Sequence, residues 1–190
     1  MPQVVLSVFT SLDGFYAGPN GEFIPPEWSD DMEAWAGAAM AQSSHFIYGR
    51  VNFAFNKAFW SEAETNPDSP AAEHAYAKEM NAKPKTVFSR TLTGDPGWNA
   101  VVSDDPAARV AELKASVDKD IFIFGSGNLV KSFVALDLID EYRILLTPSV
   151  QGSGMRLFGD SAPNLPLTLV EARGLDTGAV LLRHRRKREV

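Results

Sequence analysis

The chain has 190 residues, of which 45% are hydrophobic and 22% charged, and its formal net charge is −6. That length and composition suit a globular domain with a core of ordinary size. The acidic balance disfavours a protein that binds a nucleic-acid duplex, which usually needs a basic face. Because cysteine is absent, disulfides, thiolate catalysis and cysteine-ligated metal sites are excluded.

The first residues, MPQVVLSVFTSLDG, lack the basic start and long apolar stretch of a secretory signal, and no apolar run approaches a membrane span. We therefore expect a cytoplasmic protein with no membrane partner, folded as one domain over residues 1–190. The basic run Arg183–Arg188 is expected to belong to a solvated, unstructured tail from about residue 184.

Apolar and β-branched residues in Val4–Thr10 predict a central strand that is covered on both faces. After it, short apolar runs alternate with segments of helical periodicity. Strands are predicted at 45–48, 85–88, 121–124 and 141–150, and helices at 30–42, 51–59, 71–80, 106–116 and 128–136. Two strands, 167–172 and 179–184, follow one another as an antiparallel pair.

This alternation predicts an α/β fold of three layers. We expect a mostly parallel central sheet with helices on both faces and an antiparallel strand pair at the C-terminal end. Ligands of such sheets bind beyond the carboxyl ends of the strands. Residues that directly follow a predicted strand are therefore the first candidates for a site.

Three strand ends carry residues suited to an anion. Gly125–Gly127 opens a helix, where free backbone N–H groups and the helix dipole favour a phosphate, although a plain tight turn is the alternative. Arg50 either pairs with a phosphate or is a surface arginine. Ser89–Thr91 is either a ligand contact or a polar loop. Together the three ends could line an extended, multiply charged ligand such as a dinucleotide.

Other chemistries find less support in the sequence. The histidines, His45, His74 and His184, have no metal-ligand spacing, so no metal is expected. Neither the Gly-x-Ser-x-Gly elbow of serine hydrolases nor the Walker A pattern is present. These absences leave the strand-end anion site as the leading interpretation.

For a proton donor, the predicted helix 30–42 offers Glu33. It lies about 90° from the centre of the apolar stripe of that helix, at about 100° per residue. A carboxyl group turned into an apolar cleft beside Trp35 could donate a proton, and an ordinary helix-surface glutamate is the alternative. Asp13, in SLDG, is either a turn-former or a cleft residue after the first strand.

The ordered set SLDGFYAGPNG, YGRVNF, KTVFSRTL, IFIFGSGNLVKSF and EYRILLTPSVQGSGMRLF resembles the dihydrofolate-reductase-like superfamily. Within it, the chain is similar to the C-terminal reductase domain of the bifunctional riboflavin-biosynthesis deaminase/reductase, from about Val4 to about Arg185. The resemblance implies a dihydrofolate-reductase-like fold, NADPH as the cofactor and a homodimer. The implied reaction is hydride transfer to a polarised C=N or C=O bond of a small heterocycle, of the pterin or aminopyrimidine type.

The resemblance also implies roles for particular residues. The cofactor would be contacted by Ala17 and Gly18 at the nicotinamide, by Gly49, Arg50, Val51 and Asn52 at the phosphates, by Ser89, Arg90 and Thr91 at the adenosine 2′-phosphate and adenine, and by Gly125, Ser126, Gly127, Asn128 and Leu129 at the pyrophosphate. Glu33 falls where dihydrofolate reductases carry their substrate-binding acid, and Thr147 matches the threonine that steadies it. With Asp13, these two are the predicted catalytic residues.

The sequence departs from the family pattern at two cofactor positions, because Asn52 replaces the usual threonine and Ser126 replaces a glycine. No deaminase sequence with a zinc site accompanies the reductase-like one, which puts the riboflavin intermediate in doubt as the substrate. Two other interpretations stay open. One is a non-catalytic nucleotide-binding protein that has lost the acid, and the other is an oligomerising domain with no ligand.

Overall fold

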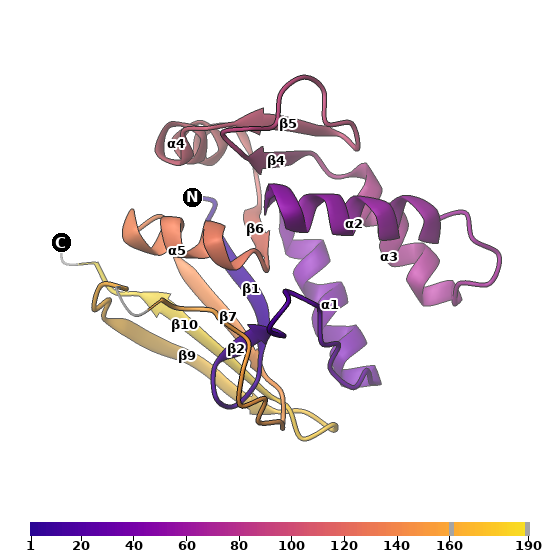
Figure 1. The fold of residues 1–190 in the computed structure, drawn as a ribbon, viewed down its shortest axis with the longest axis vertical. Coiled ribbons are helices and arrows are strands. Elements are labelled where there is room, and N and C mark those ends of the chain that lie inside the picture. Colours follow the sequence, from indigo (N-terminus) through magenta and orange to yellow (C-terminus); the bar gives the residue numbers. More distant parts are fainter. Residues whose placement is uncertain (160–161, 189–190) are drawn as a thin grey trace.

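A computed structural model describes residues 1–159 and 162–188 of the chain (Figure 1). The helices are α1 (Asp30–Gln42), α2 (Arg50–Ala63), α3 (Ala71–Ala82), α4 (Pro106–Ser116) and α5 (Gly127–Ala135). The strands of the main sheet are β1 (Val4–Thr10), β3 (Ser43–Gly49), β4 (Lys85–Phe88), β5 (Ala100–Ser103), β6 (Asp120–Phe124), β7 (Glu141–Leu146), β9 (Leu167–Gly174) and β10 (Val180–Arg186). Two short strands, β2 (Phe15–Ala17) and β8 (Met155–Arg156), form a separate antiparallel pair.

The main sheet has eight strands in the order β5-β4-β3-β6-β1-β7-β10-β9. The first six of these run parallel. β10 then joins β7 antiparallel, and β9 pairs antiparallel with β10 at the outer edge. The predicted α/β fold, with its mostly parallel sheet and antiparallel C-terminal pair, is confirmed. None of the described helices is both long and apolar enough to cross a membrane.

Strand β1 lies in the middle of the sheet and is buried on both faces, as its apolar composition predicts. Side chains alternate along a strand, so Val4, Leu6 and Val8 face one side and Val5 faces the other. The first side is covered by α4 and α5, and the second by α1, α2 and α3 (Figure 1). Because the six strands β5, β4, β3, β6, β1 and β7 run parallel, their carboxyl ends share one end of the sheet, where the candidate residues lie.

The helices begin in two different ways. The Ser29 hydroxyl caps α1 by accepting the Met32 N–H, and the Asp105 carboxylate caps α4 by accepting the Ala108 N–H at 3.0 Å, as Asp105-Pro106 predicts. The helices α2, α3 and α5 have no side-chain cap. The backbone N–H groups at the starts of these three helices are therefore not satisfied by their own cap residues.

Several strand boundaries differ from the prediction. The strand predicted at 141–150 ends at Leu146, and β2, β5 and β8 were not predicted. β5 is a four-residue edge strand in which Val101 is 48% exposed, so it has no continuous buried face. Such short, half-exposed strands carry little hydrophobic periodicity for a sequence pattern to detect.

The prediction of an unstructured basic tail is wrong for Arg183–Arg188. β10 continues to Arg186 and lies between β7 and β9, so its arginines face carboxylates. Arg183 and Arg185 pair with Glu141, which is only 1% exposed, at 3.1 and 3.3 Å. Arg188 pairs with Asp140 at 2.6 Å. The repulsion among the basic residues of Arg183–Arg188 is offset by Glu141 and Asp140, which are distant in sequence and are brought next to these residues by the fold.

Candidate functional site

The ends of β3 and β6 lie side by side, and the segments that follow them are joined by hydrogen bonds. The Gly49 N–H donates to the Ser126 hydroxyl at 2.9 Å, across 77 positions of sequence. The Asn52 side-chain amide donates to the Phe124 carbonyl. Two of the predicted cofactor segments, Gly49–Asn52 and Gly125–Leu129, are therefore brought together at the carboxyl edge of the sheet.

The start of α5 has a backbone arranged for an anion. Ser126, its N-cap residue, is in the left-handed region, with φ 76° and ψ 62°. Its hydroxyl is turned toward Gly49 rather than back onto its own helix. Because α2 also starts without a side-chain cap at Gly49, two adjacent helix starts present backbone N–H groups and positive dipole ends to one place.

Tyr16 of β2 covers part of this place. A Cβ atom added at Gly127, the first residue of α5, would collide with the Tyr16 phenol. The ring therefore lies directly against the helix start. Burial raises the pKa of the Tyr16 hydroxyl, while the Gly127 backbone N–H acts in the opposite direction. Any side chain at position 127 would collide with the Tyr16 ring, so the observed position of the ring requires a glycine there.

Ala17 and Gly18 follow Tyr16 and are both buried. The Gly18 N–H donates to the Glu22 carbonyl at 3.0 Å, so the chain turns back on itself directly after β2. Through Tyr16, this segment lies beside the start of α5. The predicted nicotinamide segment is thus at the same edge as the two predicted phosphate segments.

The two arginines predicted at the phosphates are both exposed. Gly49 and Phe88 are paired in the β3–β4 register, so the segments that begin with Arg50 and Ser89 leave the sheet from neighbouring strands. The Ser89 hydroxyl accepts the Thr91 N–H at 3.2 Å, which folds that loop back on itself. Among the described residues, no carboxylate forms an ion pair with Arg50 or Arg90, so both cations are available to a phosphate.

A cavity of about 210 Å³ lies at the carboxyl ends of β1 and β7. Thr147, predicted as a catalytic residue, is in its wall, and its hydroxyl donates to the Thr10 carbonyl at 3.2 Å. The other lining residues come from the end of β1, from β2, from residues 148–151 and 177–179, and from Ile24–Glu27. We call residues 21–27 (GEFIPPE) the strap, because this segment connects β2 to α1 over the cavity.

Glu33 does not line this cavity. α1 turns Met32 and Ala36 into the core, and Glu33 lies on the exposed side of the first turn. This position matches the alternative in which Glu33 is a helix-surface residue. The acid that does line the cavity is Glu27, in the strap, and no sequence pattern singled it out.

The Asp13 carboxylate is held by three neighbours at the turn after β1. Its Oδ1 accepts the Ser11 hydroxyl at 2.6 Å and the Gln151 N–H at 3.1 Å, and its Oδ2 accepts the Gly152 N–H at 2.8 Å. These bonds, that from Ser11 first, lower the pKa of the Asp13 carboxyl to about 2. Asp13 therefore stays ionised at neutral pH and ties the two loops together, as a turn-former does.

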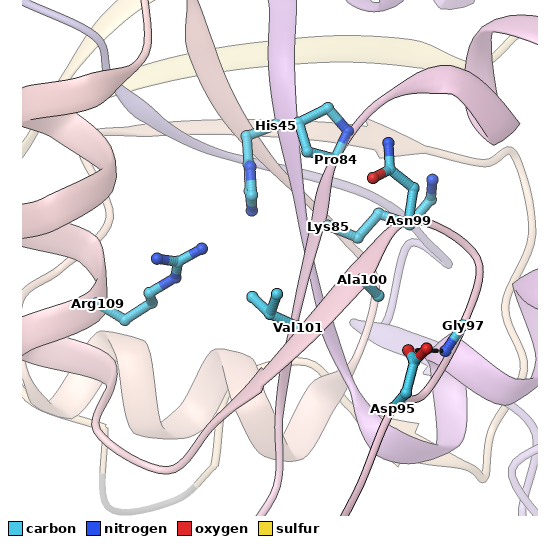
Figure 2. A pocket seen from close by; sticks show the side chains of 9 residues that line it. All are labelled: His45, Pro84, Lys85, Asp95, Gly97, Asn99, Ala100, Val101 and Arg109. Carbon is cyan, nitrogen blue, oxygen red and sulfur yellow. Dashed lines mark hydrogen bonds between the residues drawn. The ribbon is translucent and has the colours of Figure 1, made fainter.

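A second cavity, of about 270 Å³, lies at the opposite, amino-terminal ends of β3, β4 and β5 (Figure 2). The His45 and Arg109 side chains point into it, and both contact the Thr86 hydroxyl. Burial lowers the pKa of His45 to about 4, so this imidazole is neutral at pH 7. The cavity lies away from the strand ends where the other candidate residues gather. Within the described residues, no group of three or more His, Asp or Glu side chains could hold a metal ion.

Comparison with known proteins assigns the chain to a family. The model of the RibD C-terminal domain matches residues 2–181. The uncharacterized protein YyaP of Bacillus subtilis is 30% identical over 179 residues, which cover 94% of this chain and 92% of YyaP.

Solved structures agree on the fold. The crystal structure of a putative riboflavin biosynthesis protein from Shewanella sp. PV-4 superposes with a TM-score of 0.76 and 23% identity, over 98% of this chain and 99% of that one. A diaminohydroxyphosphoribosylaminopyrimidine deaminase/5-amino-6-(5-phosphoribosylamino)uracil reductase from Thermotoga maritima superposes with a TM-score of 0.67 and 16% identity. The match covers 98% of this chain but 57% of the Thermotoga chain.

Proposed function

The chain belongs to the family of RibD C-terminal domains, and from that membership we propose that it is an NADPH-dependent reductase of a small heterocycle. The observation that carries the proposal is the pair of uncapped helix starts, α2 and α5, joined by the bond from Gly49 to Ser126. Backbone N–H groups from two helix starts at one place suit the two phosphates of a dinucleotide. The residues present therefore fit the group that the family implies.

Each cofactor segment has a distinct task in this proposal. The two segments Gly125–Leu129 and Gly49–Asn52 would form the helix starts that face the pyrophosphate, and Arg50 and Arg90 would pair with the 2′-phosphate region. Ser89 and Thr91 would flank the adenosine, and Ala17 and Gly18 would flank the nicotinamide. The hydride comes from the reduced nicotinamide ring when NADPH is bound.

The substrate would bind in the cavity at the ends of β1 and β7. Its volume, about 210 Å³, is below the roughly 300–1,000 Å³ of sites for drug-sized ligands, so it suits one small ring system of the pterin or aminopyrimidine type. Thr147 would form part of the wall, with its hydroxyl held by the Thr10 carbonyl at 3.2 Å and beside the Ser149 hydroxyl at 2.9 Å. Asp13 would act indirectly, because it keeps residues 151–152 against the turn after β1.

The test is titration with NADPH and with NADH, followed by tryptophan fluorescence, for the wild type and for the Arg50→Ala, Arg90→Ala variant. We expect the wild type to prefer NADPH and the variant to lose about tenfold or more in NADPH affinity, since it loses two charge-assisted contacts. The Lys78→Ala, Arg173→Ala variant removes two exposed cations elsewhere and should bind as the wild type does.

Two outcomes would contradict the proposal in different ways. Absence of binding by either nucleotide would exclude a reductase and favour an oligomerising domain. Tight NADPH binding with no oxidation of NADPH by any pterin or aminopyrimidine would favour a non-catalytic nucleotide-binding protein. Thermal unfolding gives an independent reading, because a ligand at 100 times its Kd adds about 2.7 kcal/mol.

A further inference from the structure

We infer that the cavity at the ends of β1 and β7 takes a planar heterocycle that bears N–H donors and no phosphate, and that Glu27 sets this preference. The inference rests on the proposed function, because it names the substrate class of the proposed reductase cleft. It is carried by three properties of the cavity wall: its charge, its unpaired hydrogen-bonding groups and its aromatic rings.

The charge of the wall is negative. Among the described residues that line the cavity, Glu27 alone is charged, and no lysine or arginine is in the wall. A phosphate monoester carries about −1.5 to −2 charges at pH 7 and is normally bound by arginine, lysine or several N–H groups. A phosphorylated substrate would therefore meet a carboxylate with no cation to offset it.

One cation that contacts a residue of this wall is already engaged. Arg156 stacks on Phe15, with 4.6 Å from its guanidinium carbon to the ring centroid. It also donates to the Asp13 carbonyl at 3.1 Å. Arg156 is not among the residues that line the cavity. Arg50 and Arg90 lie at the ends of β3 and β4, on the cofactor side of the proposed cleft.

Two side chains of the wall, Glu27 and Gln151, offer hydrogen-bond acceptors to a ligand. The side-chain carbonyl oxygen of Gln151 is buried and has no partner among the described residues. The Thr147 hydroxyl is engaged within the protein, because it donates to the Thr10 carbonyl at 3.2 Å and lies 2.9 Å from the Ser149 hydroxyl. The Gln151 oxygen and the Glu27 carboxylate match ring N–H and amino groups, because a buried acceptor is stabilised by a donor.

Aromatic rings form one side of the cavity. Phe9 and Phe15 line it, and Phe9 packs edge-on against Trp35 with 5.9 Å between ring centroids. Phe23 of the strap lies 6.3 Å from Phe9, centroid to centroid. The strap residues Ile24–Glu27 form another part of the wall. A flat ring system can stack in such a space, whereas a sugar phosphate finds no cation for its phosphate among the described residues of the wall.

The experiment compares neopterin with neopterin 3′-monophosphate, which differ in one phosphate. Each is titrated by calorimetry into the wild type, with and without saturating NADP⁺. We expect neopterin to bind at least about tenfold more tightly, because the phosphate is repelled by Glu27 without compensation.

The Glu27→Lys variant places a cation in the wall and should abolish or reverse the preference. Glu27 is exposed and makes no hydrogen bond among the described residues, so the fold should tolerate the change. The matched control is Glu33→Lys, which makes the same charge change outside the cavity and should keep the wild-type ratio. Melting curves for all three proteins check that each is folded.

A wild-type preference for neopterin that is lost in Glu27→Lys and kept in Glu33→Lys would support the inference. Equal or tighter binding of the phosphate, an unchanged ratio in Glu27→Lys, or no binding of either pterin would overturn it. The NADP⁺ titration separates this result from the proposed function. Selective neopterin binding without NADP⁺ binding would sustain the cavity inference and contradict the reductase.

Discussion

Gly49 and Ser126 hold the starts of two helices together, because the Gly49 N–H donates to the Ser126 hydroxyl at 2.9 Å. The same pair leaves no space for a side chain at position 49. A Cβ atom added there would lie 2.6 Å from the Ser126 oxygen and 3.6 Å from Leu129 Cβ. The hydrogen bond and the lack of space at position 49 both follow from the short distance between Gly49 and Ser126. Mutations at the two positions can measure their effects separately.

We expect Gly49→Ala to lower the free energy of unfolding by about 1–3 kcal/mol, because the new methyl group displaces the Ser126 hydroxyl. In a Ser126→Gly background the obstructing oxygen is absent, so the same substitution should cost less by at least about 1 kcal/mol. Urea unfolding of the four proteins measures this coupling. Additive effects would show that the two residues do not constrain one another.

Tyr16 should compete with the cofactor for the start of α5, since its ring lies against Gly127. We expect Tyr16→Ala to tighten NADP⁺ binding by roughly 3–10-fold, because the tyrosine ring no longer covers the start of α5 in the free protein. Tyr16→Phe keeps the ring and should bind within about twofold of the wild type. Weaker binding by Tyr16→Ala would mean that the ring contacts the nucleotide instead. Calorimetric titration with NADP⁺ distinguishes the two results.

Lys85 is 1% exposed, and its ammonium lies 4.2 Å from the Trp98 ring centroid and donates to the Lys83 carbonyl at 2.6 Å. Among the described residues no carboxylate pairs with it, and burial lowers the pKa of Lys85 to about 8. Between this value and the ordinary lysine pKa near 10.4, the unfolded chain binds more protons than the folded one. The free energy of unfolding should therefore rise with pH in this window.

The rise attributable to Lys85 is on the order of 3 kcal/mol across the full window. We expect Lys85→Met to remove it, so that its urea-unfolding curves change less than those of the wild type between pH 8 and 9.5. Lys78→Met, at an exposed position of the same region, is the control and should follow the wild type. Parallel pH profiles for all three proteins would show that Lys85 remains charged in the fold.

Glu141 is the centre of the ion pairs that order the C-terminal strand. It accepts from Arg143 at 2.6 Å and from Arg183 at 3.1 Å. Glu141→Gln leaves the buried Arg143 without its counter-charge and removes one of the two carboxylate partners of the half-buried Arg183, so it should cost about 3–5 kcal/mol of unfolding free energy. Glu171→Gln, at a more exposed carboxylate that also pairs with Arg183, is the control and should cost about 1 kcal/mol or less.

The acid sensitivity of the fold should change with the same variant. Burial alone would raise the pKa of the Glu141 carboxyl, but the bond from Arg143 and the charge of Arg183 leave this pKa below its ordinary value. The stabilisation is therefore present above the unfolded pKa and is lost as pH falls through the lower folded value. Urea unfolding from pH 6 to pH 3 should show a shallower decline for Glu141→Gln, and an unchanged slope would contradict this role.

We propose that the homodimer implied by the family resemblance would use the outer edge of the sheet. β9 has one neighbour, and Leu169 and Val170 on it are 57% and 42% exposed. An apolar edge strand of this kind is a site for pairing with another chain. We expect light scattering to give a dimer for the wild type and a monomer for Leu169→Lys, with Leu136→Lys as the exposed control. A monomeric wild type would exclude this interface.

Local sequence was sufficient for most helices and for the buried strands. The β-branched run Val4–Thr10 could be assigned to the middle of the sheet, because a strand with apolar residues on both faces is covered on both sides. Asp105-Pro106 marked the start of α4 with a cap and a first-turn proline. β5 was missed since a short edge strand has no buried face to produce a pattern.

The site was predictable only in part. Glycines and arginines after strands indicated an anion site, because the carboxyl ends of parallel strands share one edge. The tie between Gly49 and Ser126 depends on β3 and β6 being neighbours, which no local pattern specifies. Helical periodicity predicted the angle between Glu33 and the apolar stripe of its helix. That angle does not show whether a cleft or solvent lies next to Glu33 in the folded protein.

The sequence by itself determined the alternation of strands and helices, the burial of the central strands and the residue types at their ends. Tertiary structure decided that Glu27 lines the cavity instead of Glu33, and that Arg183–Arg188 is ordered against Glu141 and Asp140. The physical reason is that local patterns reflect the conformation and burial of one segment. Charge pairing and cavity walls depend on which distant segments the sheet order brings together.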